Sequence, residues 1–170
     1  MRRDLITKLN KLRLDKKVVI NDKNNLINPP EFNLHKPIIS VSVSNINQYN
    51  LVKSLGIEHI YFDNVVRRNN SNFIDSDKEI LVGGLNGIEH YKNNKNIVTD
   101  YSLNVVNYKT VALLHSLNVN RVTLSHEIDK ERINQLVDNY FNEYNTYPNL
   151  ELIVYGKTKL MHTKYCILKR

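Results

Sequence analysis

The sequence predicts an α/β fold built on a parallel β-sheet of about six β–α units. Short β-branched runs alternate with amphipathic helical patterns, as parallel sheets require, because each crossover must return the chain to the same end of the sheet. The segments "SLGIEHIYF" and "SLNVNRVTL" also repeat one helix–cap–strand unit, with Gly56 and Asn118 at matching places. A complete TIM barrel typically needs about 250 residues, so this chain predicts a partial or degenerate TIM-barrel-like sheet.

The first part of the chain differs from the rest. Residues 1–17 are expected to form an amphipathic helix, because leucines recur at helical spacing between charged side chains. A polar linker interrupted by prolines follows it. We therefore expect an N-terminal helix and linker over residues 1–36 and a β/α barrel-like domain over residues 37–170.

The remaining elements follow from hydrophobic period and turn residues. Strands are expected where β-branched or apolar runs lie between turn residues, at 38–44, 57–62, 79–85, 96–103, 119–124 and 150–155. Helices are expected where apolar residues recur at helical spacing behind a capping side chain, at 45–55, around 88–91, at 104–117 and at 129–144. Asn45 and Asp129 are the expected N-caps, Pro148 is expected to end the last helix, and the polar stretch 63–78 is expected to be a loop.

Composition narrows the class of protein. The net charge is +7, and basic residues gather near both ends of the chain. Clustered Lys and Arg neutralise phosphates, so RNA is one expected partner, and a solvated basic surface is the plainer interpretation. A single cysteine excludes an internal disulfide framework. No apolar run reaches the ~18–20 residues of a membrane span, so we expect a cytoplasmic protein without a membrane partner.

Parallel α/β folds gather their reactive groups at the carboxyl ends of the strands. The predicted strand ends place these residues on one rim: Ser44, Asp63, Gly83, Gly84, Asn104, Ser125, His126, Glu127 and Gly156. Several also have a structural interpretation, since Ser44 suits a helix cap, the glycine pair suits a tight turn and Glu127 suits a helix-dipole partner. His162 and Cys166 would share one helix face, but two ligands do not complete a metal site, and a lone cysteine often packs in a core.

Two longer segments resemble a known family. The segments "DYSLNVVNYKTVALLHSLNVNRVTLSHEI" and "LELIVYGKTKLMHTKYC" are similar to motifs of the collagenase-like peptidase family, family U thirty-two of the peptidase classification. The resemblance covers most of residues 37–166 and implies a TIM-barrel-like fold. Members are named as peptidases, which makes a hydrolase one expectation. Others resemble RNA or quinone hydroxylation factors with an iron–sulfur cluster held by four cysteines, so our preferred hypothesis is an RNA-modification (hydroxylation) module.

The resemblance also assigns roles to single residues. It makes Cys166 the first metal ligand of such a cluster, Gly156 a cofactor-binding position, and Asn104 and Glu127 motif positions. We take Asn104 and Glu127 as candidate catalytic residues together with His162, which could pair with the cysteine as a nucleophile.

The chain departs from the family pattern in its cysteines, because the other three cluster ligands are missing. No cofactor is therefore expected in this chain alone, and an iron–sulfur cluster is expected only if the natural protein continues with more cysteines. The chain is accordingly expected to be incomplete for catalysis alone. The alternative is a non-catalytic basic α/β module that binds RNA, a partner domain or a second barrel module.

Overall fold

The computed structural model describes residues 2–14, 27–33, 35–62, 79–93 and 96–157. In chain order the elements are α1 (Arg2–Leu14), β1 (Ser40–Val43), α2 (Ile46–Ser54), β2 (His59–Phe62), β3 (Glu79–Val82), α3 (Leu85–Tyr91), β4 (Asn96–Thr99), a short 3₁₀ helix (Tyr101–Leu103), α4 (Tyr108–Ser116), β5 (Val119–Thr123), α5 (Lys130–Tyr144) and β6 (Leu150–Glu151). Within these residues every strand pair is parallel, which confirms the α/β class. Barrel-like closure and the division into two domains stay predictions.

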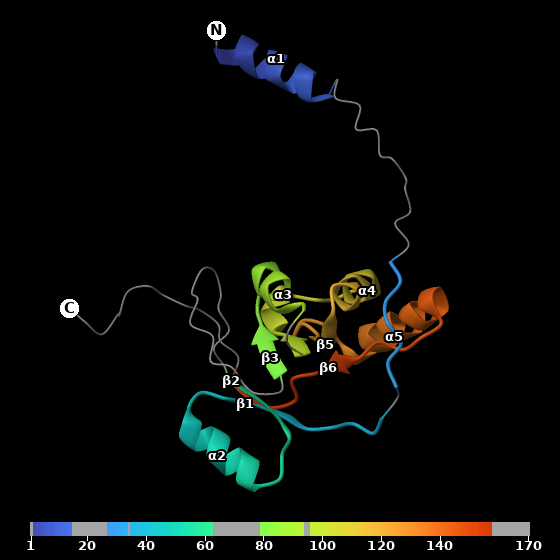
Figure 1. Ribbon diagram of the computed structural model, residues 1–170. Helices are drawn as coiled ribbons and strands as arrows, with labels where there is room; N and C mark the ends of the chain where they lie inside the picture. Colours follow the sequence, from blue (N-terminus) through green and yellow to red (C-terminus); the bar gives the residue numbers. More distant parts are fainter. Residues whose placement is uncertain (1, 15–26, 34, 63–78, 94–95, 158–170) are drawn as a thin grey trace, which may run out of the picture.

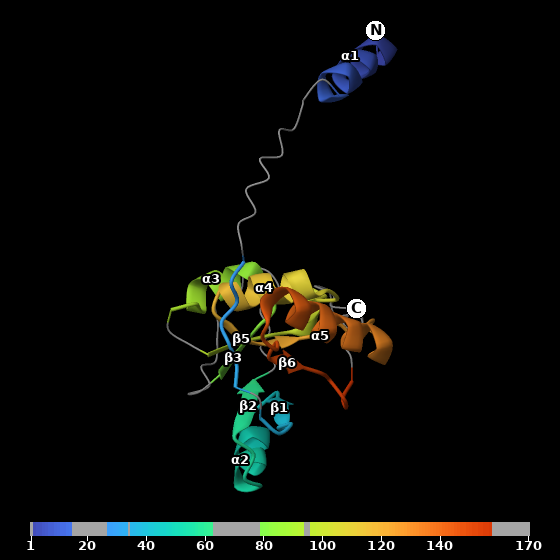
Figure 2. The ribbon, with the colours of Figure 1, turned by 90° about the vertical axis from the view of Figure 1, so that its right-hand side faces the viewer.

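The strands form two small sheets. β1 pairs with β2, while β3, β4, β5 and β6 form the second sheet in chain order. In both views of the ribbon, α3, α4 and α5 lie together on one side of the four-stranded sheet, and β1, α2 and β2 lie on its other side (Figures 1 and 2). The sheet therefore has one face covered by helices and an inner face turned toward β2.

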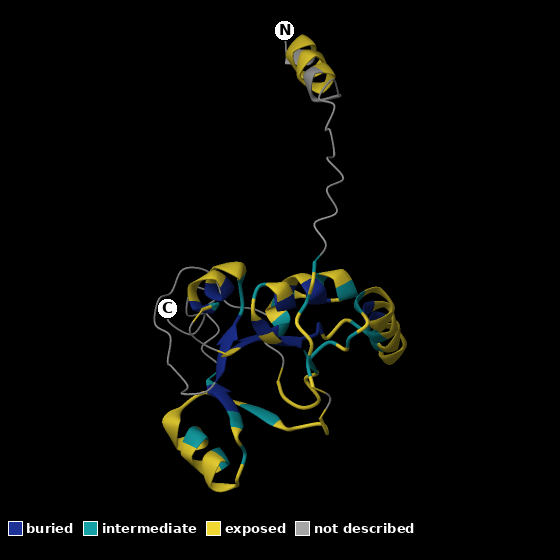
Figure 3. Ribbon diagram, turned by 45° about the vertical axis from the view of Figure 1, so that its right-hand side comes forward, coloured by how far each residue is buried: buried dark blue, intermediate teal, exposed yellow. Residues whose placement is uncertain are grey.

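The core lies between the four-stranded sheet and its helices (Figure 3). Apolar residues on one face of the strands pack against apolar residues of α3, α4 and α5. The buried members from the strands are Ile80, Val82, Ile97, Val119 and Val122, and those from the helices are Ile88, Tyr91, Val111, Ala112, Leu114, Leu136 and Tyr140. Each such side chain contributes about 1.5–3 kcal/mol by leaving water, so this layer holds the rim residues in place.

The helix caps and the repeated unit agree with the sequence prediction. The Asn45 side chain accepts a hydrogen bond from Gln48 N at 3.0 Å, and the Asp129 side chain accepts one from Arg132 N at 2.8 Å. Gly56 and Asn118 both have positive φ, at 80° and 66°. Glycine and asparagine tolerate this backbone conformation, so both helix–cap–strand units turn at the predicted place.

The region between β4 and α4 differs from the prediction. The strand expected over 96–103 ends at Thr99, because the Asp100 carboxylate accepts a hydrogen bond from Ser102 N and turns the chain into the 3₁₀ helix. Asn104 then adopts a left-handed conformation with φ 51°. The helix expected from residue 104 therefore begins at Tyr108, behind an asparagine N-cap.

Two strand ends are also corrected, and the stop signal of one helix is a different residue from the expected one. The strand expected over 79–85 ends at Val82, because Gly84 caps α3. The helix α5 ends at Tyr144 as predicted, but the residue that ends it is Asn145, with a left-handed backbone at φ 54°, rather than Pro148. The strand expected over 150–155 pairs only at Leu150–Glu151, and Val154 and Tyr155 are 92% and 97% exposed. An apolar alternation does not by itself supply a pairing partner.

The N-terminal helix is confirmed over the described part, Arg2–Leu14. Its apolar residues Leu5, Ile6 and Leu9 are exposed. The rest of the expected linker up to residue 26, and the expected loop over 63–78, lie outside the described residues. No helix in the described ranges has the length and apolar character needed to cross a membrane.

Candidate functional site

The carboxyl ends of β3 and β4 are joined by backbone and side-chain hydrogen bonds. Asp100 N donates to Val82 O at 2.8 Å, so the chain leaving β4 stays beside the end of β3. Ser102 Oγ donates to Gly83 O at 3.5 Å, a weaker contact between the same two strand ends. These ends form one side of the rim at which parallel sheets place their binding groups.

Ser125 joins the end of β5 to this rim. Its hydroxyl donates to Asn104 Oδ1 at 2.6 Å and accepts from Glu127 N at 3.2 Å, while its own N–H donates to Val105 O at 3.0 Å. Ser125 is buried, whereas Asn104 and Glu127 are exposed. The structure thus brings together two of the candidate catalytic residues, and Ser125 is the residue that connects them.

Two aromatic rings lie at the same rim. The rings of Tyr101 and His126 are 4.3 Å apart between centroids and are tilted by 48°. His126 is exposed and Tyr101 is partly exposed. A ring pair of this kind offers a flat, partly apolar surface beside the hydrogen-bonding groups of Asn104 and Ser125.

The other predicted rim residues have structural roles or lie elsewhere. Gly84 N-caps α3, and its carbonyl accepts hydrogen bonds from the N–H groups of the following turn, as the tight-turn interpretation predicts. Ser44 N donates to Gln48 Oε1 at 2.8 Å at the start of α2. Gly156 lies beyond the end of β6, is exposed and has φ 145°, a conformation that favours glycine. Asp63, His162 and Cys166 lie outside the described residues.

The described residues do not fit a metal or an iron–sulfur cluster. No group of three or more His, Cys, Asp or Glu side chains in these ranges lies close enough to hold a metal ion. The sequence contains one cysteine, whereas such a cluster takes four thiolates.

The inner face of the sheet carries a charged group that the sequence prediction missed. Arg121 on β5 donates two parallel hydrogen bonds to Glu79 on β3, from Nη1 to Oε1 at 3.0 Å and from Nη2 to Oε2 at 2.9 Å. Its Nε donates to Glu151 Oε2 on β6 at 2.8 Å. The arginine and both glutamates have side chains about one-tenth exposed or less. We call these residues, with their partners on β2, the inner-face cluster.

The partners on β2 extend this cluster to the other sheet. Tyr61 OH donates to Glu151 Oε1 at 2.5 Å, and Thr123 Oγ1 donates to the same oxygen at 3.1 Å. His59 Nδ1 lies 3.1 Å from Glu79 Oε1. Side chains of the inner-face cluster therefore connect β2 to β3, β5 and β6.

The electrostatics of the cluster favour its charged form. Burial alone raises the pKa of Glu79, but hydrogen bonds and charge attraction from Arg121, with a contribution from His59, lower that pKa overall. Burial likewise lowers the pKa of Arg121, and the carboxylates of Glu79 and Glu151 outweigh it, so its pKa is raised. Burial and then Glu151 raise the pKa of Tyr61, which remains a neutral donor. The cluster is a satisfied ion-pair network that fixes the strands.

One signal in the sequence points to this cluster. Each of three mostly apolar strand segments carries one charged residue: Glu79 at the start of "EILV", Arg121 in "VNRVT" and Glu151 in "LELIV". Buried charges of opposite sign are retained when they are paired, so charges inside neighbouring strands predict a network. Their meeting on one face depends on the strand register, which places Thr123 opposite Glu151.

The fold and the rim define a parallel α/β protein with a candidate binding site at the carboxyl ends of β3, β4 and β5. The model of peptidase family U32 matches residues 81–170, more than half of the chain and all of this rim. The chain belongs to peptidase family U32, which confirms the resemblance seen in its motifs. No curated protein and no solved structure matches the chain.

Proposed function

We propose that the chain is an RNA-modification (hydroxylation) type member of its family and that its own part in the reaction is to bind single-stranded RNA at the rim. The rim is defined by Tyr101, Asn104, Ser125, His126 and Glu127. In this proposal the chain is incomplete for catalysis alone, with His162 as a catalytic residue, Gly156 as a cofactor-binding position and Cys166 as a metal ligand.

The hydrogen bonds of the Ser125 hydroxyl favour a binding role for this site over peptide hydrolysis. A serine nucleophile needs a base such as an imidazole to take its proton. The Ser125 proton instead goes to Asn104 Oδ1, and the oxygen accepts from Glu127 N. Neither partner is a general base for this hydroxyl, so its geometry supports positioning of neighbouring groups.

The ring pair and the charge of the chain support RNA as the ligand. Bases of single-stranded RNA stack on exposed aromatic side chains, and each such contact contributes about 1–3 kcal/mol. Tyr101 and His126 present rings beside an exposed amide at Asn104. The net charge of +7 favours association with a phosphate backbone.

Binding of a short fluorescent single-stranded RNA tests the proposal. Between about 50 and 200 mM salt the affinity is expected to fall by about tenfold or more, because about three neutralised phosphates are enough for that change. His126→Ala is expected to weaken binding about tenfold at each salt concentration, since it removes stacking area. Fluorescence anisotropy measures both effects.

The matched control is Asn139→Ala on the exposed side of α5, away from the rim, which is expected to bind like the unchanged chain. An affinity that does not respond to salt would contradict phosphate contacts. No binding at low salt would contradict the RNA proposal as a whole and would favour the partner-domain alternative.

A further inference from the structure

The helix α1 carries an apolar face and a basic flank, and both are exposed. Leu5 and Leu9 lie one turn apart and are 63% and 49% exposed, and Ile6 beside them is 50% exposed. Lys8 and Lys11 lie one turn apart on the neighbouring flank and are exposed. In both views of the ribbon α1 lies apart from the two sheets and their helices (Figures 1 and 2). A helix of 13 residues is marginal in water on its own, so α1 needs a partner surface to persist.

The helix α5 presents a matching surface on its solvent side. Glu131, Asn134, Asp138 and Phe141 follow one another at intervals of three and four residues, so they form one exposed stripe along the helix. At the end of this stripe Phe141 stacks on Tyr147, with ring centroids 4.7 Å apart, and the two residues are 36% and 39% exposed. We call these five residues the α5 stripe, a surface that combines two carboxylates with an apolar end.

The charges of the two helices are opposite. α1 contains five basic residues and one acidic residue, whereas α5 with its N-cap Asp129 contains four acidic and two basic residues. α2 and α4 also expose apolar residues, but neither contains an acidic side chain. On α3 the acidic residue is Glu89, which already pairs with Lys92. Complementary charge selects among partner surfaces, so among the described helices the α5 stripe fits α1 best.

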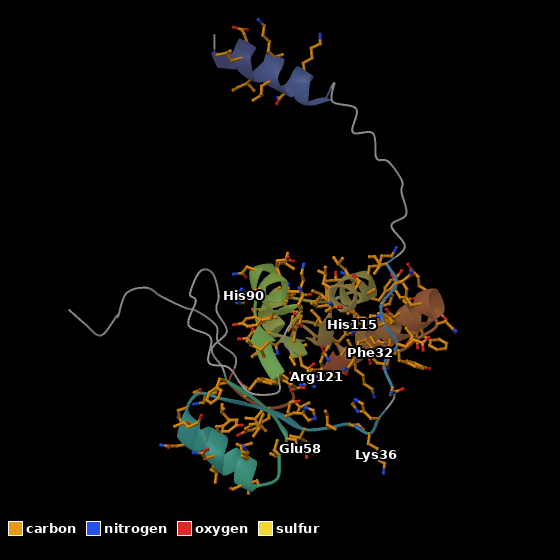
Figure 4. All side chains as sticks on the ribbon, viewed as in Figure 1. Phe32, Lys36, Glu58, His90, His115 and Arg121 are labelled. Atoms are coloured by element: carbon orange, nitrogen blue, oxygen red, sulfur yellow. The ribbon has the colours of Figure 1, made fainter. Side chains whose placement is uncertain are left out.

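The chain from α1 joins the rest of the structure on the side where α5 lies. Ile27 packs against the core beneath the helices, and the Phe32 ring lies 4.5 Å from that of His115 on α4 (Figure 4). Residues 15–26 connect α1 to this anchored segment, and a chain of that length spans at most about 40 Å. The whole of α5 is only about 22 Å long, so α1 can reach the stripe of its own chain.

We propose that α1 docks on the α5 stripe of its own chain. The leucines of α1 cover the aromatic pair at the end of the stripe, and its lysines lie beside the two carboxylates. A tether of this length gives an effective concentration in the millimolar range. An intrinsic dissociation constant of about 1 mM is therefore enough to dock half of the chains. Because both charged surfaces are exposed, salt weakens the docking.

Carbodiimide crosslinking of the full chain tests this proposal, because the reagent joins a lysine to a carboxylate that it contacts. At about 50 mM salt we expect mass spectrometry to find Lys8 or Lys11 joined to Glu131 or Asp138. These products should fall at least about fivefold at about 500 mM salt. An equal mixture of unlabelled and ¹⁵N-labelled chains shows which copy is joined, since docking within one chain links peptides of one label only.

Exchanged charges test the specificity of the contact. Replacing both carboxylates, by Glu131→Lys with Asp138→Lys, should abolish the crosslinks between α1 and α5. Adding Lys8→Glu with Lys11→Glu should restore crosslinks between the same positions, because each ion pair is then reversed. Glu58→Lys is the matched control, since this exposed carboxylate lies on the other side of the four-stranded sheet (Figure 4), and it should leave the crosslinks unchanged. Thermal melting of each variant shows that the fold is retained.

Hydrogen exchange of the α1 amides provides a readout that does not depend on the crosslinking chemistry. Docking predicts that these amides exchange at least about threefold more slowly in the unchanged chain than in Phe141→Ser, which removes the apolar end of the stripe. Crosslinks between peptides of different label would place α1 on a second copy and overturn the proposal. The proposal is also overturned if no α1–α5 crosslink forms at low salt, or if α1 exchanges equally fast in both chains.

Discussion

Replacing Arg121 by alanine is expected to lower the free energy of unfolding by about 3–5 kcal/mol. The guanidinium pairs with Glu79 through two hydrogen bonds and with Glu151 through a third, and all three side chains are nearly buried. Its removal leaves both nearly buried carboxylates without their guanidinium partner. Urea unfolding followed by circular dichroism measures the loss.

A surface pair provides the control for this prediction. Lys92 and Glu89 form an i,i+3 ion pair at 2.7 Å, in which the Lys92 side chain is partly exposed and the Glu89 side chain is exposed. Lys92→Ala should therefore lower the free energy of unfolding by less than about 1 kcal/mol. Combining Arg121→Met with Glu79→Gln and Glu151→Gln should recover part of the loss, because no uncompensated charge then remains. A loss below about 1 kcal/mol in Arg121→Ala would contradict the structural role of the inner-face cluster.

Stability is expected to fall as the pH drops from about 6.5 to about 4, because of His115 on α4. This side chain is fully buried, and its ring lies 4.5 Å from that of Phe32 (Figure 4). Its Nδ1 donates to Val119 O at 2.8 Å, so Nε2 carries the free lone pair and has no hydrogen-bond partner among the described residues. Protonation would place a charge in this apolar packing.

The sign of the effect follows from the pKa. Burial, opposed in part by the hydrogen bond to Val119, lowers the pKa of His115 from 6.5 to about 4. The unfolded chain therefore takes up the proton first, and the contribution is complete above pH 6.5 and lost on acidification, in total about 3 kcal/mol. Glu79, whose pKa is also lowered, adds a further loss below its ordinary value of 4.5.

The measurement is urea unfolding at several pH values between 7 and 4. His115→Gln keeps a donor for Val119 O without a titrating group and should flatten the curve above pH 4.5, where Glu79 begins to contribute. The exposed His126→Gln should retain the full acid loss. A free energy of unfolding in the unchanged chain that is level between pH 6.5 and pH 4.5 would show that His115 does not couple folding to pH.

The fold class can be predicted from the sequence, because the spacing of hydrophobic residues and the helix caps depend on neighbouring residues in the chain. Asn45 and Asp129 cap α2 and α5 as predicted, and Gly56 and Asn118 turn the chain at matching places. The exact ends of helices and strands are harder to predict, because they also depend on contacts with distant parts of the chain. The strand expected through residue 155 pairs only as far as Glu151, because pairing depends on a neighbouring strand and not on apolar character alone.

The candidate site also contains some residues that the sequence identifies and others that it does not. The motif resemblance points to Asn104 and Glu127, and the predicted strand ends place both on one rim. The linking role of Ser125 depends on the left-handed turn at Asn104, which no hydrophobic pattern reports. Arg121 was missed because a charge inside a strand becomes meaningful only once the register brings its partners to the same face.

The most direct measurement of the central claim is photo-crosslinking of a 4-thiouridine-containing single-stranded RNA to the chain, followed by mass spectrometry of the crosslinked peptides. RNA binding at the rim predicts crosslinks to Tyr101 and His126 and to their neighbours in residues 100–108 and 124–128, and these should weaken in His126→Ala. Crosslinks confined to α1, α2 or the outer side of α5, with none at the rim, would contradict the account.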